Sequence, residues 1–411
     1  MLKLISKSII SVLGAMALIS CASQSTPTSN YQFALQAVTD AEPELIAFRH
    51  DLHRHPELAG NERRTASKIS EKLNALGYEV RTGVGGYGVV AILEGKYPGS
   101  TVAFRADMDA VAGDALDPVP YASVIDNVHH TCGHDIHTTI GIGIAEGFAA
   151  IQENLSGSII LIFQPAEEAG TGAEAMLAEA LFEDQIPESI FAVHTAPFDV
   201  GQLAVMPDGM LAGRTAIEIS LTGDGDLEAA ATAMRNTLMG ISDISYETML
   251  IFQTEPFIFV DLAPQGPAKN QQVKVSGYVM SAGISDRVRV ESAMNAAVTS
   301  MAFDGIDISL RTNQALEGVN NDPQLVATSS AAIIEQAPEL QVLPVPGVIP
   351  AFSEDFGSFQ RSIPGVMYFV GVNNPEAGTI GFPHSPDFIA DDGAILTGTK
   401  AMLAAMLEEL T

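Results

Sequence analysis

Short apolar runs alternate with helical stretches along the first half of the chain, from about residue 36. The runs have the length and composition of buried strands and lie at 89–93, 101–104, 158–163 and 189–193. Helices are predicted at 61–76, 138–153 and 173–181. Gly77 ends the first of these helices as a C-cap. Strands that alternate with helices predict an α/β fold in which helices cover both faces of a sheet.

The pattern changes near residue 213. The predicted elements are then a strand at 216–222, a helix at 227–240, strands at 257–262 and 272–280, a helix at 286–303 and a strand at 306–311. This β-α-β-β-α-β order is typical of a small α+β domain of the split-βαβ, ferredoxin-like kind. The α/β pattern returns after about residue 320. The sequence therefore predicts a larger domain in two parts, 35–212 and 316–411, interrupted by an inserted domain at 213–315.

The N-terminal residues 1–20 are predicted to be a targeting segment. Two lysines precede the apolar run 9–19, which is too short to span a bilayer. Ser20 and Cys21 follow the run, so the cysteine comes directly after a small residue, as in the lipobox of bacterial lipoproteins. Cys21 would then be acylated and begin the mature protein, with 21–34 as a tether. A plain signal peptide cut nearby is the alternative.

Composition limits the classes of partner. The 411 residues contain 50 Asp and Glu against 20 Lys and Arg, a formal net charge of −30. Such a surface repels phosphates, so nucleic-acid binding is excluded. The chain has only 2 Cys, which excludes a disulfide framework. We expect an exported protein of the bacterial cell envelope, on the periplasmic or extracellular face, that touches the membrane only through its lipid anchor.

The histidines indicate where the chemistry lies. The chain has 9 His, and none lies between residues 195 and 383. The densest cluster is the segment 129–137, where Cys132 and His134 are separated by one glycine. A thiolate and an imidazole that face one point suit Zn²⁺ and neighbouring divalent metals. On its own, this segment could also be a His-rich surface loop with a buried thiol.

Further candidate ligands follow predicted strands. Glu167 and Glu168 come just after the strand at 158–163, where ligands bind in open α/β sheets. Adjacent side chains point in different directions, so one carboxylate can bind a metal while the other reaches a water. Paired glutamates on an exposed helix are the alternative. His194 ends another strand, and His384 adds an imidazole from far along the chain.

Asp107 and Asp109 close one more strand, and their spacing places both side chains on one face. Carboxylates in such a position commonly accept hydrogen bonds from ligating histidines and so fix the ring orientation. A simple turn at the strand end is the alternative. Taken together, the clusters favour a metal site.

The motifs run in a characteristic order, at 49–57, 84–90, 105–110, 130–135, 163–168, 194, 353–356 and 384–386. In this order they resemble the amidohydrolase branch of the zinc aminoacylase and carboxypeptidase family. That branch includes hippurate hydrolases, indole-acetyl-amino-acid hydrolases and N-acetyl-diaminopimelate deacetylases. The resemblance covers nearly the whole mature chain.

The resemblance implies a catalytic domain like that of di-metal exopeptidases, with a mixed sheet, interrupted by a lid domain through which relatives often dimerise. It implies an amidohydrolase that uses two divalent metal ions, Zn²⁺ or Mn²⁺, on an N-acyl amino acid or a similar small amide. Glu167 would be the general base, which takes a proton from water and passes it to the leaving amine. The implied metal ligands are Cys132, His134, Glu168, His194 and His384, with Cys132 shared.

The inserted domain departs from the family pattern. Relatives carry a histidine after its first strand, but 221–228 is shortened here and has none. Asp224 and Asp226 in this segment would repel a developing oxyanion. Asn270 matches a family asparagine that contacts substrate. The arginine that relatives carry at the end of the following strand is replaced around 280–281.

Three functions therefore stay open. The first is an amidohydrolase acting on N-acyl amino acids or similar small amides. The second is a catalytically silent lipoprotein that binds metal and a ligand or partner, and the third is a hydrolase of amides without a free carboxylate. The missing histidine also removes the reason to expect a homodimer. Cationic substitutes near the cleft, for which Arg214, Arg235 and Lys269 are the candidates, would favour the third function.

Overall fold

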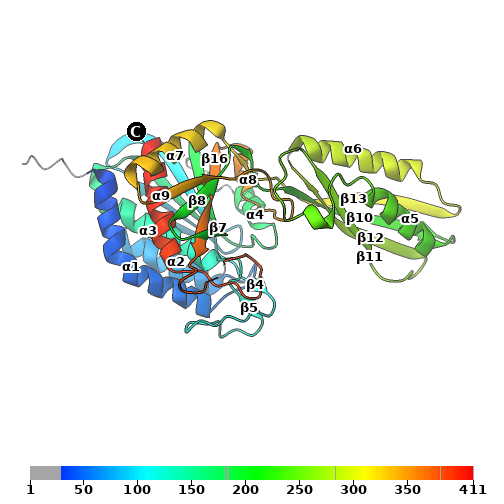
Figure 1. The fold of residues 1–411 in the computed structure, drawn as a ribbon, viewed down its shortest axis with the longest axis horizontal. Helices are drawn as coiled ribbons and strands as arrows, with labels where there is room; N and C mark the ends of the chain where they lie inside the picture. The colour runs from blue at the N-terminus through cyan, green and yellow to red at the C-terminus, as the bar shows by residue number, and fades with distance from the viewer. Residues whose placement is uncertain (1–28, 180, 183–184, 283, 380, 411) are drawn as a thin grey trace, which may run out of the picture.

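The computed structural model describes residues 29–179, 181–182, 185–282, 284–379 and 381–410. The predicted signal segment, Cys21 and the first part of the predicted tether lie outside these residues. Figure 1 shows a larger domain that holds both ends of the described chain and an inserted domain that extends away from it. Among the described residues, no helix has both the length and the apolar character needed to cross a bilayer.

The larger domain is built on an 8-stranded mixed sheet with the order β1-β2-β6-β3-β7-β16-β8-β15. The central strands β6, β3, β7 and β16 run parallel, while β1 and β2 pair antiparallel at one side. Parallel strands bring their carboxyl ends to one edge, which is where the candidate ligands lie. The strands are β1 (Glu79–Val84), β2 (Gly88–Glu94), β3 (Tyr97–Asp107), β6 (Ser156–Gln164), β7 (Ser189–Asp199), β8 (Gln202–Val205), β15 (Gln341–Pro344) and β16 (Gly365–Asn373).

Helices cover both faces of this sheet. Successive residues of β6 point to opposite sides, so Leu161 enters one apolar core and Ile162 the other. The first core lies under α1 (Asn30–Arg54), α2 (Arg63–Ala75), α3 (His134–Ile151), α7 (Pro323–Gln336) and α9 (Gly393–Glu409), and the second lies under α4 (Gly172–Ala178) and α8 (Gly357–Gln360). The short elements are β4 (Val111–Ala112), β5 (Val128–His129), η1 (Gln152–Asn154), β9 (Asp208–Gly209), η2 (Tyr246–Thr248) and β14 (Asn320–Asn321).

Helix α3 is buried on nearly every side, which requires small residues where other helices approach it. A Cβ on Gly143 would lie 2.6 Å from Thr399 Oγ1 on α9. The glycine therefore lets α3 and α9 pack closely. This close packing fixes α3, whose first residue His134 is a candidate metal ligand, against α9.

The first helix corrects one predicted boundary. The sequence predicts a tether over 21–34, but in the structure α1 begins at Asn30. Ser29 Oγ accepts a hydrogen bond from the Gln32 backbone N–H at 3.2 Å, and Gln32 Oε1 accepts one from the Ser29 N–H at 3.3 Å. This capping box starts the helix, and the burial of Tyr31 and Ala34 fixes it to the domain. Residues 30–34 therefore belong to the helix.

The inserted domain has an antiparallel 4-stranded sheet with the order β11-β12-β10-β13. Two helices cover one face of the sheet and enclose a separate apolar core. This arrangement confirms the predicted α/β fold with an inserted split-βαβ domain. The elements are β10 (Gly213–Gly223), α5 (Leu227–Met239), β11 (Ile258–Pro264), β12 (Gln272–Ser281), α6 (Ile284–Ser300) and β13 (Ile306–Leu316).

Candidate metal centre

Strand β6 leads to the two glutamates through a tight turn. Ala166 has a φ of 56°, a left-handed conformation that is costly for a residue with a side chain. The turn is held in place because the Ala166 N–H donates to Glu62 Oε1 at 2.8 Å. Asp109 accepts hydrogen bonds from the backbone N–H groups of Glu167 at 3.2 Å and of Glu168 at 3.0 Å. These contacts fix the direction in which both carboxylates leave the backbone.

The Cys132 and His134 pair lies at the N-terminus of α3. Gly133 between them has a φ of 85°, and a Cβ there would lie 2.6 Å from Thr195 Cγ2. Thr195 Oγ1 donates to the Cys132 carbonyl at 2.6 Å. Only glycine allows this turn, and the turn places the thiol and the imidazole beside His194 on β7.

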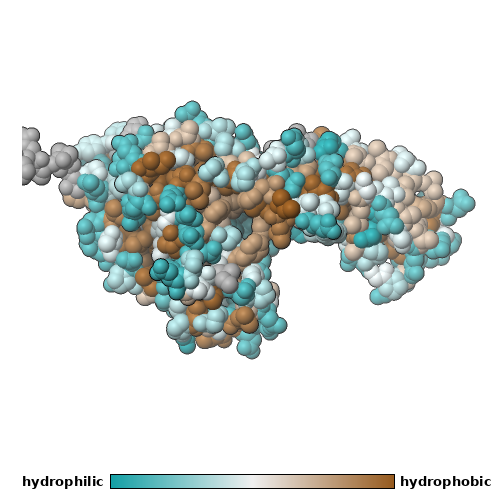
Figure 2. Space-filling model, viewed as in Figure 1, coloured by the Kyte–Doolittle hydropathy of each residue, from teal (hydrophilic) through white to brown (hydrophobic). Residues whose placement is uncertain are grey.

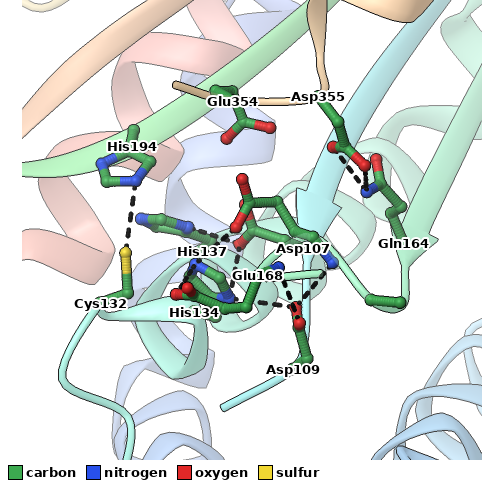
Figure 3. Close-up of polar contacts among 12 residues, drawn as sticks. Asp107, Asp109, Cys132, His134, His137, Gln164, Glu168, His194, Glu354 and Asp355 are labelled. Atoms are coloured by element: carbon green, nitrogen blue, oxygen red, sulfur yellow. Dashed lines mark hydrogen bonds and ion pairs between the residues drawn. The ribbon is translucent and has the colours of Figure 1, made fainter. Parts of the chain in front are cut away.

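All the predicted ligands meet in one cluster, part of which is drawn in Figure 3. Cys132 Sγ lies 3.5 Å from His194 Nε2, and His384 Nε2 lies 3.3 Å from Glu168 Oε1. His134 Nε2 is 3.8 Å from one carboxylate oxygen of each glutamate that follows β6. Ligand atoms within 4.8 Å of one another form the overlapping groups Cys132–His134–His194, Cys132–Glu168–His384 and His134–Glu167–Glu168.

The cluster fits divalent cations. Within the described residues, His134 Nε2 and Glu168 Oε1 are buried, and neither makes a hydrogen bond of normal geometry, although His384 Nε2 lies 3.3 Å from Glu168 Oε1. A buried polar atom without a partner costs about 1–3 kcal/mol, so a ligand for these atoms is expected. Cysteine, histidine and carboxylate donors together suit Zn²⁺ and Mn²⁺. Cys132 belongs to two of the groups, so it would contribute to both sites if each held a cation.

The electrostatics of the cluster favour ionised ligands. Burial alone would raise the pKa of the Cys132 thiol, but the neighbouring imidazoles of His194 and His134 lower it to about 5. Burial raises the pKa of Glu167 well above its ordinary value, and the negative charges of Glu354 and Glu168 raise it further. The cluster therefore combines a thiolate with a carboxylate that holds a proton readily, and both properties are useful beside cations.

His137, for which the sequence suggests no role, lies next to the cluster and links Asp107 to the backbone of Thr195. Its Nδ1 lies 2.6 Å from Asp107 Oδ1, and its Nε2 accepts a hydrogen bond from the Thr195 backbone N–H at 2.7 Å. The proton therefore sits on Nδ1 and the ring is neutral. His134 Nδ1 lies 3.3 Å from Asp109 Oδ1 and 3.7 Å from Asp107 Oδ1. Asp107 and Asp109 thus both approach the imidazole of His134 at its Nδ1.

Arg105 is a second residue whose role the sequence does not reveal. Its guanidinium is completely buried and donates to Asp107 at 2.7 Å, to Glu354 at 2.8 Å and to Asp355 at 2.9 Å. Its Nε donates to Gln164 at 2.9 Å. This network joins β3 and β6 to a segment far along the chain. The motif segments 105–110 and 353–356 contain these residues, but nothing local in the sequence pairs them.

A cavity of about 540 Å³ opens next to the cluster, between the two domains. Figure 2 shows hydrophobic residues at the surface where the inserted domain joins the larger one. Four described residues of the inserted domain line the cavity, namely Arg214, Leu250, Phe252 and Leu316. The larger domain contributes the metal cluster and an apolar wall that includes Ile349, Phe352 and Phe382.

The structure does not bring Asn270 to the cluster. Asn270 is exposed and lies in the turn between β11 and β12, with a φ of 50°. Strand β12 runs from Gln272 beside this turn to Ser281 beside the larger domain, a length of about 30 Å at roughly 3.3 Å per residue. The predicted contact of Asn270 with substrate is therefore not made within one chain.

The other polar residues of the inserted domain are also accounted for. Asp226 caps α5 by accepting a hydrogen bond from the Ala229 N–H at 3.1 Å, and Asp224 is hydrogen-bonded to Gln271. Arg235 donates to the Leu262 carbonyl at 2.6 Å. These residues, like Lys269, do not line the cavity. Of the three candidate cations, only Arg214 does.

Known proteins show similarity over most of the chain. Residues 103–408 match the model of peptidase family M20/M25/M40. The N-acetyldiaminopimelate deacetylase of Leuconostoc mesenteroides is 29% identical over 386 residues, 88% of this chain and 96% of that protein. Thermostable carboxypeptidase 2 of Saccharolobus solfataricus is 28% identical over 384 residues, 89% of this chain and 95% of that protein. The solved structure of a dinuclear metal binding peptidase of Bacillus subtilis has a TM-score of 0.77 and 27% identity, and the match covers 90% of this chain and 99% of that one.

Proposed function

This chain belongs to the peptidase family M20/M25/M40, and from this membership and the geometry of the cluster we propose that it hydrolyses the amide bond of an N-acyl amino acid or a similar small amide. The membership confirms the resemblance that the motifs predict. The chain is a metal-dependent hydrolase of amide bonds. The observation that carries the proposal is the meeting of Glu167 and the candidate metal ligands in one cluster beside the interdomain cavity.

Two divalent cations, Zn²⁺ or Mn²⁺, would be held by Cys132, His134, Glu168, His194 and His384. Such ions, when bound, polarise a carbonyl oxygen and acidify water. Glu167 is the residue that moves the proton. Its carboxylate takes a proton from the attacking water, and the same oxygen then gives that proton to the nitrogen of the leaving amine.

Positioning of Glu167 depends on the residues around it. Asp109 fixes its backbone through the hydrogen bond at 3.2 Å, and its side chain is only 8% exposed. The low exposure keeps bulk water away from the proton that Glu167 carries. The raised pKa of Glu167 has burial as its main cause and suits a group that must hold the proton between the two transfers.

The decisive experiment compares the wild-type protein with Glu167→Gln after loading with Zn²⁺ or Mn²⁺. Release of amine from N-acetyl and N-benzoyl amino acids is measured together with the metal content of each protein. We expect equal metal content and a loss of turnover of at least about 100-fold in the variant, because general acid–base catalysis contributes about 10²–10⁴ in rate. Full metal occupancy without turnover in the wild type would instead favour a silent, metal-binding protein.

We also propose that the protein is a lipoprotein of the bacterial cell envelope, anchored through Cys21. The apolar segment 9–19, followed by a small residue and Cys21, supports this proposal. Labelling of cells with a radioactive fatty acid should mark the wild-type protein, and Cys21→Ser should remove the label. A Cys21→Ser protein that is still labelled would refute the anchor.

A further inference from the structure

Arg214 occupies an unusual position in the cavity. It is the one Lys or Arg among the described residues that line it. The side chain is exposed, and among the described residues it makes no ion pair. Its guanidinium lies over the ring of Tyr278, 4.9 Å from the ring centroid. The cation–π contact holds the guanidinium while leaving its N–H donors available.

Among the described residues, no carboxylate forms an ion pair with Arg214. In the sheet register Arg214 stands opposite Met280 on β12 and opposite Leu316 on β13. Met280 is buried in a small apolar cluster with Phe257. A guanidinium that faces a cavity and has no carboxylate partner in the described part of the chain is suited to bind a carboxylate of a ligand, because its donors match both carboxylate oxygens.

Much of the lining of the cavity is apolar. The connection between α5 and β11 contributes Leu250 and Phe252 to it. This connection is held against the larger domain by two hydrogen bonds between the backbones of Gln253 and Val348, at 2.8 and 2.9 Å. Phe352 also belongs to this apolar lining. A ligand that fills the cavity therefore needs a sizeable apolar group as well as a negative charge.

We propose that Arg214 binds the carboxylate of the substrate, so that the substrate is an N-acyl amino acid with a free carboxylate and a bulky apolar group. The inference rests on the proposed amide hydrolysis at the metal cluster. The cluster and Glu167 come from the larger domain and the carboxylate anchor from the inserted domain, so both domains are needed to position one substrate. The anchor stands on β10, directly across from the position at 280 where the family resemblance places a lost arginine.

The test compares two substrates that differ only in this charge: an N-benzoyl amino acid and its carboxamide. For the metal-loaded protein, Arg214→Gln should lower kcat/KM for the free acid by about 10- to 100-fold, mainly through KM, because a charge-assisted hydrogen bond contributes about 1.5–3 kcal/mol. Hydrolysis of the carboxamide should change less than about twofold. Arg214→Lys should restore part of the loss. Arg235→Gln is the matched control, because Arg235 binds a backbone carbonyl away from the cavity.

Equal losses on the acid and the carboxamide, or no loss on either, would overturn the role of Arg214 while leaving the proposed hydrolysis intact. If the wild type hydrolyses neither compound, equilibrium binding of the N-benzoyl amino acid decides. Binding that weakens at least about 10-fold in Arg214→Gln supports the anchor and rejects hydrolysis of these amides. Binding that is absent or unchanged rejects the anchor.

Discussion

Replacement of Arg105 by methionine tests the reasoning about the network behind the metal cluster. The change removes a completely buried guanidinium that donates to Asp107, Glu354 and Asp355. Removing one partner of a buried ion pair costs about 3–5 kcal/mol, because the remaining charge is left uncompensated. This is a large part of the roughly 5–15 kcal/mol by which native proteins are stable. At about 2–3 °C per kcal/mol, the midpoint of thermal unfolding should fall by about 6–15 °C.

The assay is thermal unfolding followed by circular dichroism, in the presence of a chelator so that metal binding does not contribute. Lys96→Met is the matched control, because the exposed ion pair of Lys96 with Glu153 should contribute little. The double variant Arg105→Met with Glu354→Gln should recover part of the loss, since one fewer buried charge is then unpaired. A fall of less than about 2 °C for Arg105→Met, or simple additivity in the double variant, would refute the reasoning.

Two further predictions concern other parts of the larger domain. Burial lowers the pKa of His53, but the neighbouring carboxylates of Asp135 and Asp117 raise it overall. Burial raises the pKa of Asp117, but its hydrogen bonds and the charge of His53 outweigh burial and lower this pKa to about 2. The lowered pKa of Asp117 stabilises the folded state fully above the unfolded value of about 3.9, and the raised pKa of His53 stabilises it fully below about 6.5. Asp117→Asn should therefore lower the free energy of unfolding most, by about 2 kcal/mol, between pH 4 and 6.5. The midpoint of thermal unfolding is measured for both proteins from pH 3 to 9. A difference between the variant and the wild type that stays constant over this range would contradict the prediction. Gly133→Ala should weaken Zn²⁺ binding in a chelator competition, because its Cβ would meet Thr195 at 2.6 Å. Gly60→Ala, with a φ of 76° and no atom within 4 Å, should not weaken it.

The order of strands and helices could be predicted from the sequence because apolar runs and helical stretches alternate clearly. The sequence pattern predicts no helix at 30–54, although the capping box formed by Ser29 and Gln32 is readable in the sequence. Polar residues and Pro43 inside the helix hide its pattern. Tertiary contacts with α3 and α9 stabilise this helix, and such contacts are not visible in a local window.

The candidate site shows the same limit. The ligands could be predicted because each lies in a short motif, although His194 lies within β7 and His384 lies in a turn. Arg105 could not be assigned a role, because its carboxylate partners Glu354 and Asp355 lie about 250 positions away in the chain. Asn270 matched a family position, but only the strand register shows that it lies at the far end of the inserted domain. Arg214 became significant only once the cavity was seen.

The backbone bridge between Gln253 and Val348 has a consequence for the motion of the two domains. The chain crosses between the domains near residues 212 and 317, and a body attached at two neighbouring points can swing about the line that joins them. Leu211, beside one crossing, pairs with Ile349, so the bridge lies close to this crossing. The bridge adds a further attachment between the domains, and beside it the Ala351 N–H donates to the Met249 carbonyl at 3.1 Å. A swing that separates 249–253 from 348–351 therefore has to break these three hydrogen bonds in addition to bending the crossings.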